Sequence, residues 1–196
     1  MCRSDAEAQA RPGILTAVTR TRWIIAAVLS LMAIVFAWIS YALFASPTVD
    51  DPGQADAIIM LDGGGRRLAK VTELVDQGVS DNVVLASKWV PPVWSASVCN
   101  TRPSPFPADV RILCFEPHPS STRGEVRFVS DLADEYGWDR LVIVASTDQV
   151  TRARMLFERC WDGELAFVDT DHKQPWPVRA VYEWAAMAKA LVNTGC

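Results

Sequence analysis

Three features of the sequence predict a three-layer α/β domain preceded by one transmembrane helix. A 23-residue apolar run, Trp23 to Ala45, lies near the N-terminus. Further along, short apolar runs alternate with amphipathic segments of helical period. These short runs are apolar throughout, without the alternation of a half-exposed strand. This pattern is typical of a mainly parallel sheet, here of five strands, with helices covering both faces.

The apolar run is long enough to cross a bilayer. Ser30 and Ser40 are the only residues in it that are not apolar. As a helix, with a rise of 1.5 Å per residue, the run would extend roughly 34 Å. Apolar side chains lie all round the helix, as lipid contact requires. The alternatives are a buried core helix and a cleaved signal peptide, but a signal peptide has a shorter apolar region that ends in a small-residue cleavage site. Phe44-Ala45-Ser46-Pro47 offers no such site, so we expect residues 23–45 to be a retained anchor in the lipid bilayer.

The charges on either side of this run predict its orientation. Arginines precede it and aspartates follow it: Arg11, Arg20 and Arg22, then Asp50, Asp51 and Asp56. Because cytoplasmic flanks are rich in arginine and lysine, residues 1–22 are predicted to stay in the cytoplasm. Residues 46–54 then form a linker, and residues 55–196 form an extracytoplasmic domain at the cell membrane.

The composition excludes two broad classes of protein. The chain has 196 residues, of which 50% are hydrophobic, and a net charge of −4. Residues 1–45 hold four arginines and two acidic residues, which leaves 15 basic and 21 acidic side chains in the other 151 residues, a net charge of −6. The chain is too apolar to be disordered and too acidic to be a general nucleic-acid binder. The length of the 151-residue segment suits one domain.

The cysteines agree with a domain outside the cytoplasm. Cys2 lies on the predicted cytoplasmic side, whereas Cys99, Cys114, Cys160 and Cys196 lie in the outer domain. An even number in an oxidising compartment predicts two disulfides, and reduced thiols are the alternative. Of three pairings we favour Cys99 with Cys114 and Cys160 with Cys196, because each ties an irregular or terminal segment to a regular element. No C-x-x-C spacing supports a metal site.

The first half of the outer domain contains two predicted strands and one helix. Ala55–Leu61 is an apolar strand that ends in the turn Gly63-Gly64-Gly65, and Arg67–Gln77 is an amphipathic helix. Asn82–Ser87 is the second strand. Residues 88–109 contain five prolines and are therefore expected to be irregular.

The next strand and helix have clear boundaries. Arg111–Phe115 is predicted as the third strand and Thr122–Tyr136 as a helix. Thr122 and Glu125 have the spacing of a capping box, in which each side chain accepts from a free backbone N–H of the first turn.

The last part of the chain repeats this arrangement. Leu141–Ser146 is a fourth strand, Ser146 and Gln149 form a second capping-box pattern that opens a helix to Cys160, and Glu164–Asp169 is a fifth strand. Pro177 suits the first turn of a final helix. The apolar face of that helix is predicted to comprise Val181, Trp184, Ala185, Ala188 and Leu191.

A ligand is expected at the carboxyl ends of the strands, where open parallel sheets usually bind one. Several segments there lead into helix N-termini, which favour anions, so the ligand is predicted to be phosphorylated or carboxylated. The candidate ligand-binding residues are Asp62, Gly63, Gly64, Gly65, Arg67, Thr122, Ser146, Gln149 and Arg152. A structural role stays open as the alternative: the glycines as a tight turn and the polar residues as helix caps. His118 and His172 are more typical of surface loops than of metal ligands, so no metal site is predicted, and no pattern identifies a cofactor.

A resemblance to a known family rests on three groups of residues. They are Asp56-Ala-Ile-Ile-Met-Leu61 with Gly63–Gly65, Arg67 and Leu68; Thr122 with Glu125; and Ala145-Ser146 followed by Arg152-Ala153. In this order they resemble the YdcF/SanA/ElyC family of envelope proteins over residues 54–190. The resemblance implies a Rossmann-like domain, often behind an N-terminal anchor, with a role in cell-envelope biogenesis. The biochemical activity of that family is poorly defined.

Two departures from the family pattern bear on catalysis. The family has Ser-Gly-Gly where this chain has Ser87-Lys88-Trp89, and a histidine where this chain has Gln149. Glutamine cannot act as a general acid or base, so Glu116, which matches an acidic position of the family, becomes the predicted catalytic base. The sequence thus supports two hypotheses. One is binding or processing, as by a hydrolase or transferase, of a phosphorylated envelope metabolite such as a lipid-linked or nucleotide-linked sugar phosphate. The other is a non-catalytic envelope scaffold or regulator.

Overall fold

The computed structural model describes residues 12–62, 65–86, 105–171 and 175–196. The chain forms two compact units, which meet in sequence between Ser40 and Tyr41. The first contains most of the N-terminal helix, and the second contains the α/β domain.

The N-terminal helix, α1 (Pro12–Phe44), includes the predicted anchor. Its segment Arg20–Phe44 is 25 residues long, has a mean hydropathy of 2.4 and is long and apolar enough to cross a membrane. Large apolar side chains such as Trp23 and Trp38 are exposed along it. Within the described part of the chain it is the one helix with these properties.

The sheet has five strands, and every pairing within it is parallel. The strands are β1 (Ala57–Met60), β2 (Asn82–Ala86), β3 (Arg111–Phe115), β4 (Arg140–Ser146) and β5 (Glu164–Thr170). Their order is β3-β2-β1-β4-β5, which is the Rossmann-like arrangement and confirms the predicted fold class. Central β1 has all four residues buried, and Ile59 pairs in register with Val84 and Ile143.

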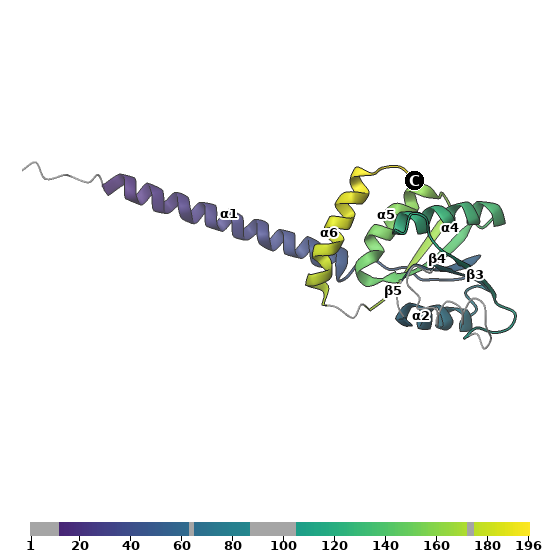
Figure 1. The fold of residues 1–196 in the computed structure, drawn as a ribbon. Coiled ribbons are helices and arrows are strands. Elements are labelled where there is room, and N and C mark those ends of the chain that lie inside the picture. Colours follow the sequence, from purple (N-terminus) through teal and green to yellow (C-terminus); the bar gives the residue numbers. More distant parts are fainter. Residues whose placement is uncertain (1–11, 63–64, 87–104, 172–174) are drawn as a thin grey trace, which may run out of the picture. The chain divides into compact units, whose positions relative to one another are not determined.

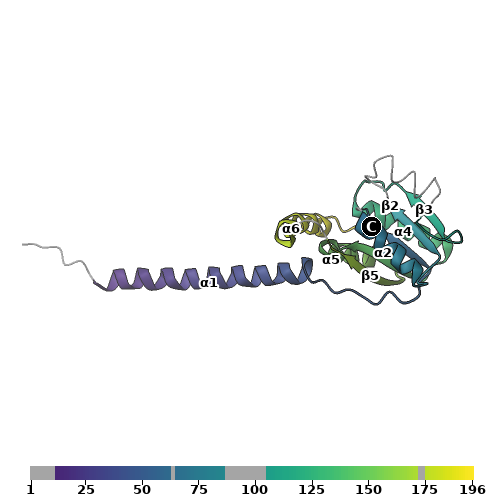
Figure 2. The ribbon, with the colours of Figure 1, turned by 90° about the horizontal axis from the view of Figure 1, so that it is seen from below.

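Helices cover both faces of this sheet. They are α2 (Gly65–Asp76), α4 (Thr122–Tyr136), α5 (Val150–Cys160) and α6 (Trp176–Val192), with a short 3-10 turn, η2 (Thr147–Gln149), before α5. Figure 1 shows α4 and α5 on one face and α2 on the other. Val126 and Phe157 pack with Ile59 on the first face, whereas Leu74 packs with Ile58 on the second. Figure 2 shows the same layers from below.

Both predicted capping boxes are wrong in detail. The N-cap of α4 is Ser121, whose hydroxyl accepts from the backbone N–H of Gly124 at 3.3 Å, so Thr122 is the first helical residue and not the cap. Ser146 stands at the N-cap position of η2 but makes no side-chain cap bond. The side chains of Glu125 and Gln149 bind elsewhere in the fold, because tertiary partners compete with local backbone groups for them.

The predicted apolar face of α6 is largely exposed and is not the side of the helix that packs on the domain. Its buried residues are Ala180, Glu183, Met187 and Ala190. Of the predicted face, Val181 and Leu191 are 74% and 55% exposed, Ala185 and Ala188 are exposed, and Trp184 is half-buried. Glu183 is part of the reason, because Arg152 of α5 binds its carboxylate and holds that side of the helix against the domain.

One predicted disulfide is confirmed. Cys160 at the end of α5 is bonded to Cys196 near the chain end. Cys114 is disulfide-bonded as well, and Cys99, its predicted partner, lies outside the described residues. Most of the irregular segment 88–109 also lies outside them.

The predicted linker, residues 46–54, is held to the domain. The backbone N–H of Asp50 donates to the Phe167 carbonyl at 2.9 Å, and its carboxylate accepts from the Phe167 N–H at 2.8 Å. Arg154 donates to the same carboxylate at 2.7 Å. Partial burial raises the pKa of Asp50, but these donors outweigh it and hold the pKa below its ordinary value.

Candidate functional site

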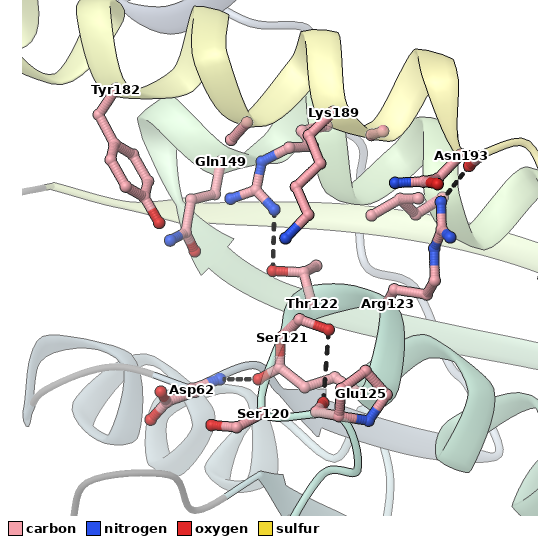
Figure 3. Close-up of a pocket in the computed structure, with 15 residues that line it drawn as sticks. Asp62, Ser120, Ser121, Thr122, Arg123, Glu125, Gln149, Tyr182, Lys189 and Asn193 are labelled. Carbon is pink, nitrogen blue, oxygen red and sulfur yellow. Dashed lines mark hydrogen bonds between the residues drawn. The ribbon is translucent and has the colours of Figure 1, made fainter.

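A pocket of about 440 Å³ opens at the carboxyl ends of β1 and β4. This is the point where the strand order reverses, because β1 leads to α2 on one face and β4 leads to α5 on the other. Figure 3 shows the side chains around it, which come from the start of α4, the start of α5 and one side of α6. The lining residues are Asp62, Pro119, Ser120, Ser121, Thr122, Arg123, Glu125, Gln149, Arg152, Leu156, Tyr182, Ala186, Lys189, Ala190 and Asn193.

The N-terminus of α4 supplies hydrogen-bond donors to this pocket. Two of the first N–H groups of the helix already have an acceptor in Ser121. Its hydroxyl accepts from the N–H of Gly124, and its carbonyl accepts from the N–H of Glu125 at 3.1 Å. The backbone N–H groups of Thr122 and Arg123 have no acceptor among the described residues. Free N–H groups at the positive end of a helix dipole favour an anion.

Gly124 allows the loop before α4 to lie against its first turn. A Cβ atom at this position would be 2.0 Å from the Pro119 carbonyl oxygen, far inside van der Waals contact. Glycine is therefore required for the close approach that places Ser120 and Ser121 at the pocket.

Three cationic side chains line the pocket. Lys189 is exposed and extends from α6 toward the start of α4 (Figure 3). Arg123 donates to the Asn193 carbonyl near the end of α6, and Arg152 reaches in from α5. Of the three, Lys189 is the exposed cation, and it can meet a ligand without first leaving the core.

Arg152 is bonded to the protein on both sides. Its Nε and Nη2 donate to the Glu183 carboxylate at 2.8 and 3.2 Å, and its Nη1 donates to the Thr122 hydroxyl at 2.9 Å. Burial lowers the pKa of Arg152, but the hydrogen bonds and the negative charge of Glu183 outweigh burial and raise the pKa above its ordinary value. Arg152 is thus fixed as a cation at the pocket wall.

A second arginine completes what we call the Glu183 network, defined as Arg152, Glu183, Arg179 and Asp148. Arg179 donates to Asp148 at 2.7 Å and lies 3.4 Å from Glu183. Glu183 is fully buried and Asp148 is 2% exposed. Two arginines and two carboxylates therefore neutralise one another inside the fold.

Arg67 is held differently, by neutral oxygens. It donates to the Leu61 carbonyl at 2.9 Å, to the Asp62 carbonyl, to Ser146 Oγ at 3.0 Å and to Gln149 Oε1 at 2.9 Å. Arg67, Ser146 and Gln149 with these two carbonyls form what we call the Arg67 network. Burial lowers the pKa of Arg67, and the nearby charges of Glu125 and Asp62 offset this in part.

Glu125 links the start of α4 to the end of β1. Its carboxylate accepts from the backbone N–H of Asp62 at 2.6 Å, and the side chain is 2% exposed. The acidic residue of the predicted capping box thus fixes the strand end at the pocket.

The structure brings most of the predicted site together. Asp62, Thr122, Gln149 and Arg152 line the pocket, and Arg67 and Ser146 adjoin it through Gln149. Gly65 begins α2, whereas Gly63 and Gly64 lie outside the described residues.

Glu116 is the predicted residue that the structure leaves apart from this group. It follows β3 directly, is exposed and is not among the lining residues of the pocket. Its role as a base stays a prediction. The described residues also contain no cluster of ligands suited to a metal ion.

Sequence patterns did not reveal the contribution of α6. Three residues of this region, Tyr182, Lys189 and Asn193, follow the start of α4 by 60, 67 and 71 residues and carry no motif. Only packing of α6 against α5 brings them to the pocket. The available signal was Glu183, the single acidic residue of a mostly apolar helix, which is consistent with a buried cationic partner.

Fold and site together define a Rossmann-like α/β domain with a polar pocket at its switch point, in a chain whose N-terminal helix can span a membrane. Comparisons with family models, curated proteins and solved structures find no match for this chain.

Proposed function

We propose that this protein is a membrane-anchored, extracytoplasmic YdcF-like protein of the cell envelope that binds a phosphorylated metabolite in the pocket at the start of α4. The observation that carries the binding proposal is that the free N–H groups of α4 and the exposed cation Lys189 line one 440 Å³ pocket. Charge-assisted hydrogen bonds from such donors suit the oxygens of a phosphate group.

The proposed location rests on three observations. The helix Arg20–Phe44 can span a membrane. Arg20 and Arg22 precede the apolar run and Asp50 follows it, as expected if the N-terminus is cytoplasmic. The disulfide between Cys160 and Cys196 is of a kind that persists in oxidising compartments.

Binding is better supported than turnover. Arg152 and Arg67 are already bonded to protein groups, and Gln149 cannot transfer a proton. If the bound ligand is processed, Glu116 is the proposed base. The same satisfied arginines favour the second candidate, a scaffold or regulator that retains the fold without a ligand.

Lys189→Ala tests the binding proposal. The full chain in lipid nanodiscs is titrated calorimetrically with UDP-N-acetylglucosamine, a polyprenyl phosphate and inorganic phosphate as separate probes. We expect at least one phosphorylated probe to bind, and the variant to bind it about tenfold more weakly, because one bond to a charged group is lost. Stability should be unchanged, since Lys189 is exposed.

Lys70→Ala is the matched control, because Lys70 pairs with Glu73 on α2, across the sheet from the pocket. It should leave affinity unchanged. Equal loss in both variants would indicate a nonspecific charge effect. No binding of any probe, with an unchanged envelope phenotype for Arg67→Ala and Glu116→Ala, would favour the scaffold.

A further inference from the structure

Helix α6 carries an apolar stripe on the side that faces away from the domain. We call it the outer face of α6: Val178, Val181, Ala185, Ala188 and Val192. The residues are spaced three and four apart, so at about 100° per residue they lie within about a quarter of the helix circumference. All five are exposed, with Val178, Val181 and Val192 at 60%, 74% and 82%.

The outer face carries no charge. The acidic residue of α6, Glu183, is fully buried on the opposite side. Arg179 pairs with Asp148. Lys189 follows Ala185 by four residues and so borders the outer face, but its side chain lines the pocket. A continuous, uncharged and exposed apolar stripe marks a surface that contacts another apolar phase.

The same helix is fastened to the end of the apolar run. Trp176 in its first turn contacts the ring of Tyr41, with ring centroids 5.6 Å apart, and Trp184 contacts Phe44 at 5.4 Å. Phe44 is 1% exposed and packs with Ala180 and Met187. Tyr41 and Phe44 belong to the α/β unit and directly follow residue 40. The covalent chain therefore keeps α6 close to the point where the span ends.

The apolar surface continues from this contact onto the outer face. Val181 precedes Trp184 by three residues and Ala188 follows it by four, so the three side chains are neighbours on the helix. Trp184 in turn contacts Phe44. Apolar groups thus extend without a break from the last turn of α1 to the exposed stripe.

We propose that α6 lies in the surface of the bilayer that α1 crosses, with its outer face in the boundary between head groups and acyl chains. This rests on the membrane anchoring in the proposed function. Interfacial helices bury an apolar face in this way, and Tyr41 and Trp176 are of the type enriched at that boundary. A second copy of the chain is less suited, because five valines and alanines fall short of the roughly 800 Å² per partner typical of a stable dimer.

A spin label at position 188 tests the proposal. The full chain with Cys2→Ser and Ala188→Cys is labelled without reducing agent and placed in phosphatidylcholine–phosphatidylglycerol nanodiscs. Collision with oxygen, which concentrates in lipid, is compared with collision with a water-soluble nickel chelate. We expect the ratio of oxygen collisions to nickel-chelate collisions to be severalfold higher at position 188 than at the control position 76. The control is Asp76→Cys, an exposed site on α2. The Cys2→Ser chain without an added cysteine corrects for background labelling.

Other results would overturn the inference. A ratio at position 188 equal to that at position 76 would mean that water covers the outer face. Protection from both reagents, or spin–spin broadening, would mean that protein covers it. Adding Val181→Asp should restore nickel access at position 188, and it should not change the circular dichroism. If alkaline carbonate releases the chain from membranes, the anchor itself is contradicted, and the inference with it; retention with a water-exposed position 188 overturns the inference alone.

Discussion

The Glu183 network and the Arg67 network each hold a buried arginine near the pocket, but with acceptors of different charge. In the first, two arginines meet two buried carboxylates. In the second, one arginine meets backbone carbonyls, a hydroxyl and an amide. A buried ion pair is costly to break, because the remaining charge loses its partner without regaining water, whereas neutral acceptors lose only hydrogen bonds. The first network is thus expected to serve mainly stability, and the second to hold the ends of β1 and β4 in place beside the pocket.

Arg152→Ala should have the largest effect. It leaves fully buried Glu183 with Arg179 as its remaining arginine partner, and the expected loss is about 3–5 kcal/mol in the free energy of unfolding. Denaturant titration followed by tryptophan fluorescence measures it. If the cost comes from an unpaired charge, Arg152→Met combined with Glu183→Leu should recover much of the loss. A double variant as unstable as the single one would contradict this explanation.

Arg67→Met should cost less, about 1–3 kcal/mol, because it removes one donor from Ser146, Gln149 and two carbonyls but leaves no ion-pair partner unpaired. The same denaturant titration measures it. Ser146→Ala, which removes one of these acceptors, serves as a partial control and should cost less still. If Arg67→Met lowered the free energy of unfolding as much as Arg152→Ala does, the proposed difference between the two networks would be contradicted.

The smallest loss in the free energy of unfolding is expected for the partly exposed pair of Asp50 and Arg154. Asp50→Asn should cost less than about 1 kcal/mol at neutral pH, because solvent screens the pair. The pKa of Asp50 is lower in the folded chain, so its carboxylate stabilises the fold above the unfolded pKa. That contribution is lost as the pH falls from about 4 through the folded pKa. Stability measured from pH 7 to pH 2.5 should therefore show the two chains converging in acid, and a constant difference would contradict the assignment.

Local patterns predicted the elements of this fold well and the partners of its side chains poorly. The continuous apolar runs at β1 and β4 cannot be half-exposed strands, and Thr122–Tyr136 is a helix with the predicted bounds. The capping-box spacing of Thr122 and Glu125 is equally clear. However, Arg152 and the N–H of Asp62 lie 30 and 63 residues away in sequence and bind those two side chains instead.

Local patterns also failed to predict which face of helix α6 is buried. It is apolar on most sides, so periodicity alone cannot say which side turns inward. Two contacts with other elements decide it: Arg152 of α5 binds Glu183, and Asp148 of η2 binds Arg179, which leaves Val181 and its neighbours outside.

The sequence by itself determined the apolar helix, the α/β alternation, the parallel sheet and the strand ends where a ligand would bind, because each follows from hydrophobic period and length over a few turns. Only the tertiary structure decided that Lys189 and Tyr182 reach the pocket, that Arg152 is neutralised while Arg67 meets neutral oxygens, and which side of α6 is exposed. These depend on contacts between segments far apart in the chain. Burial sets the strength of such contacts, and no local pattern records it.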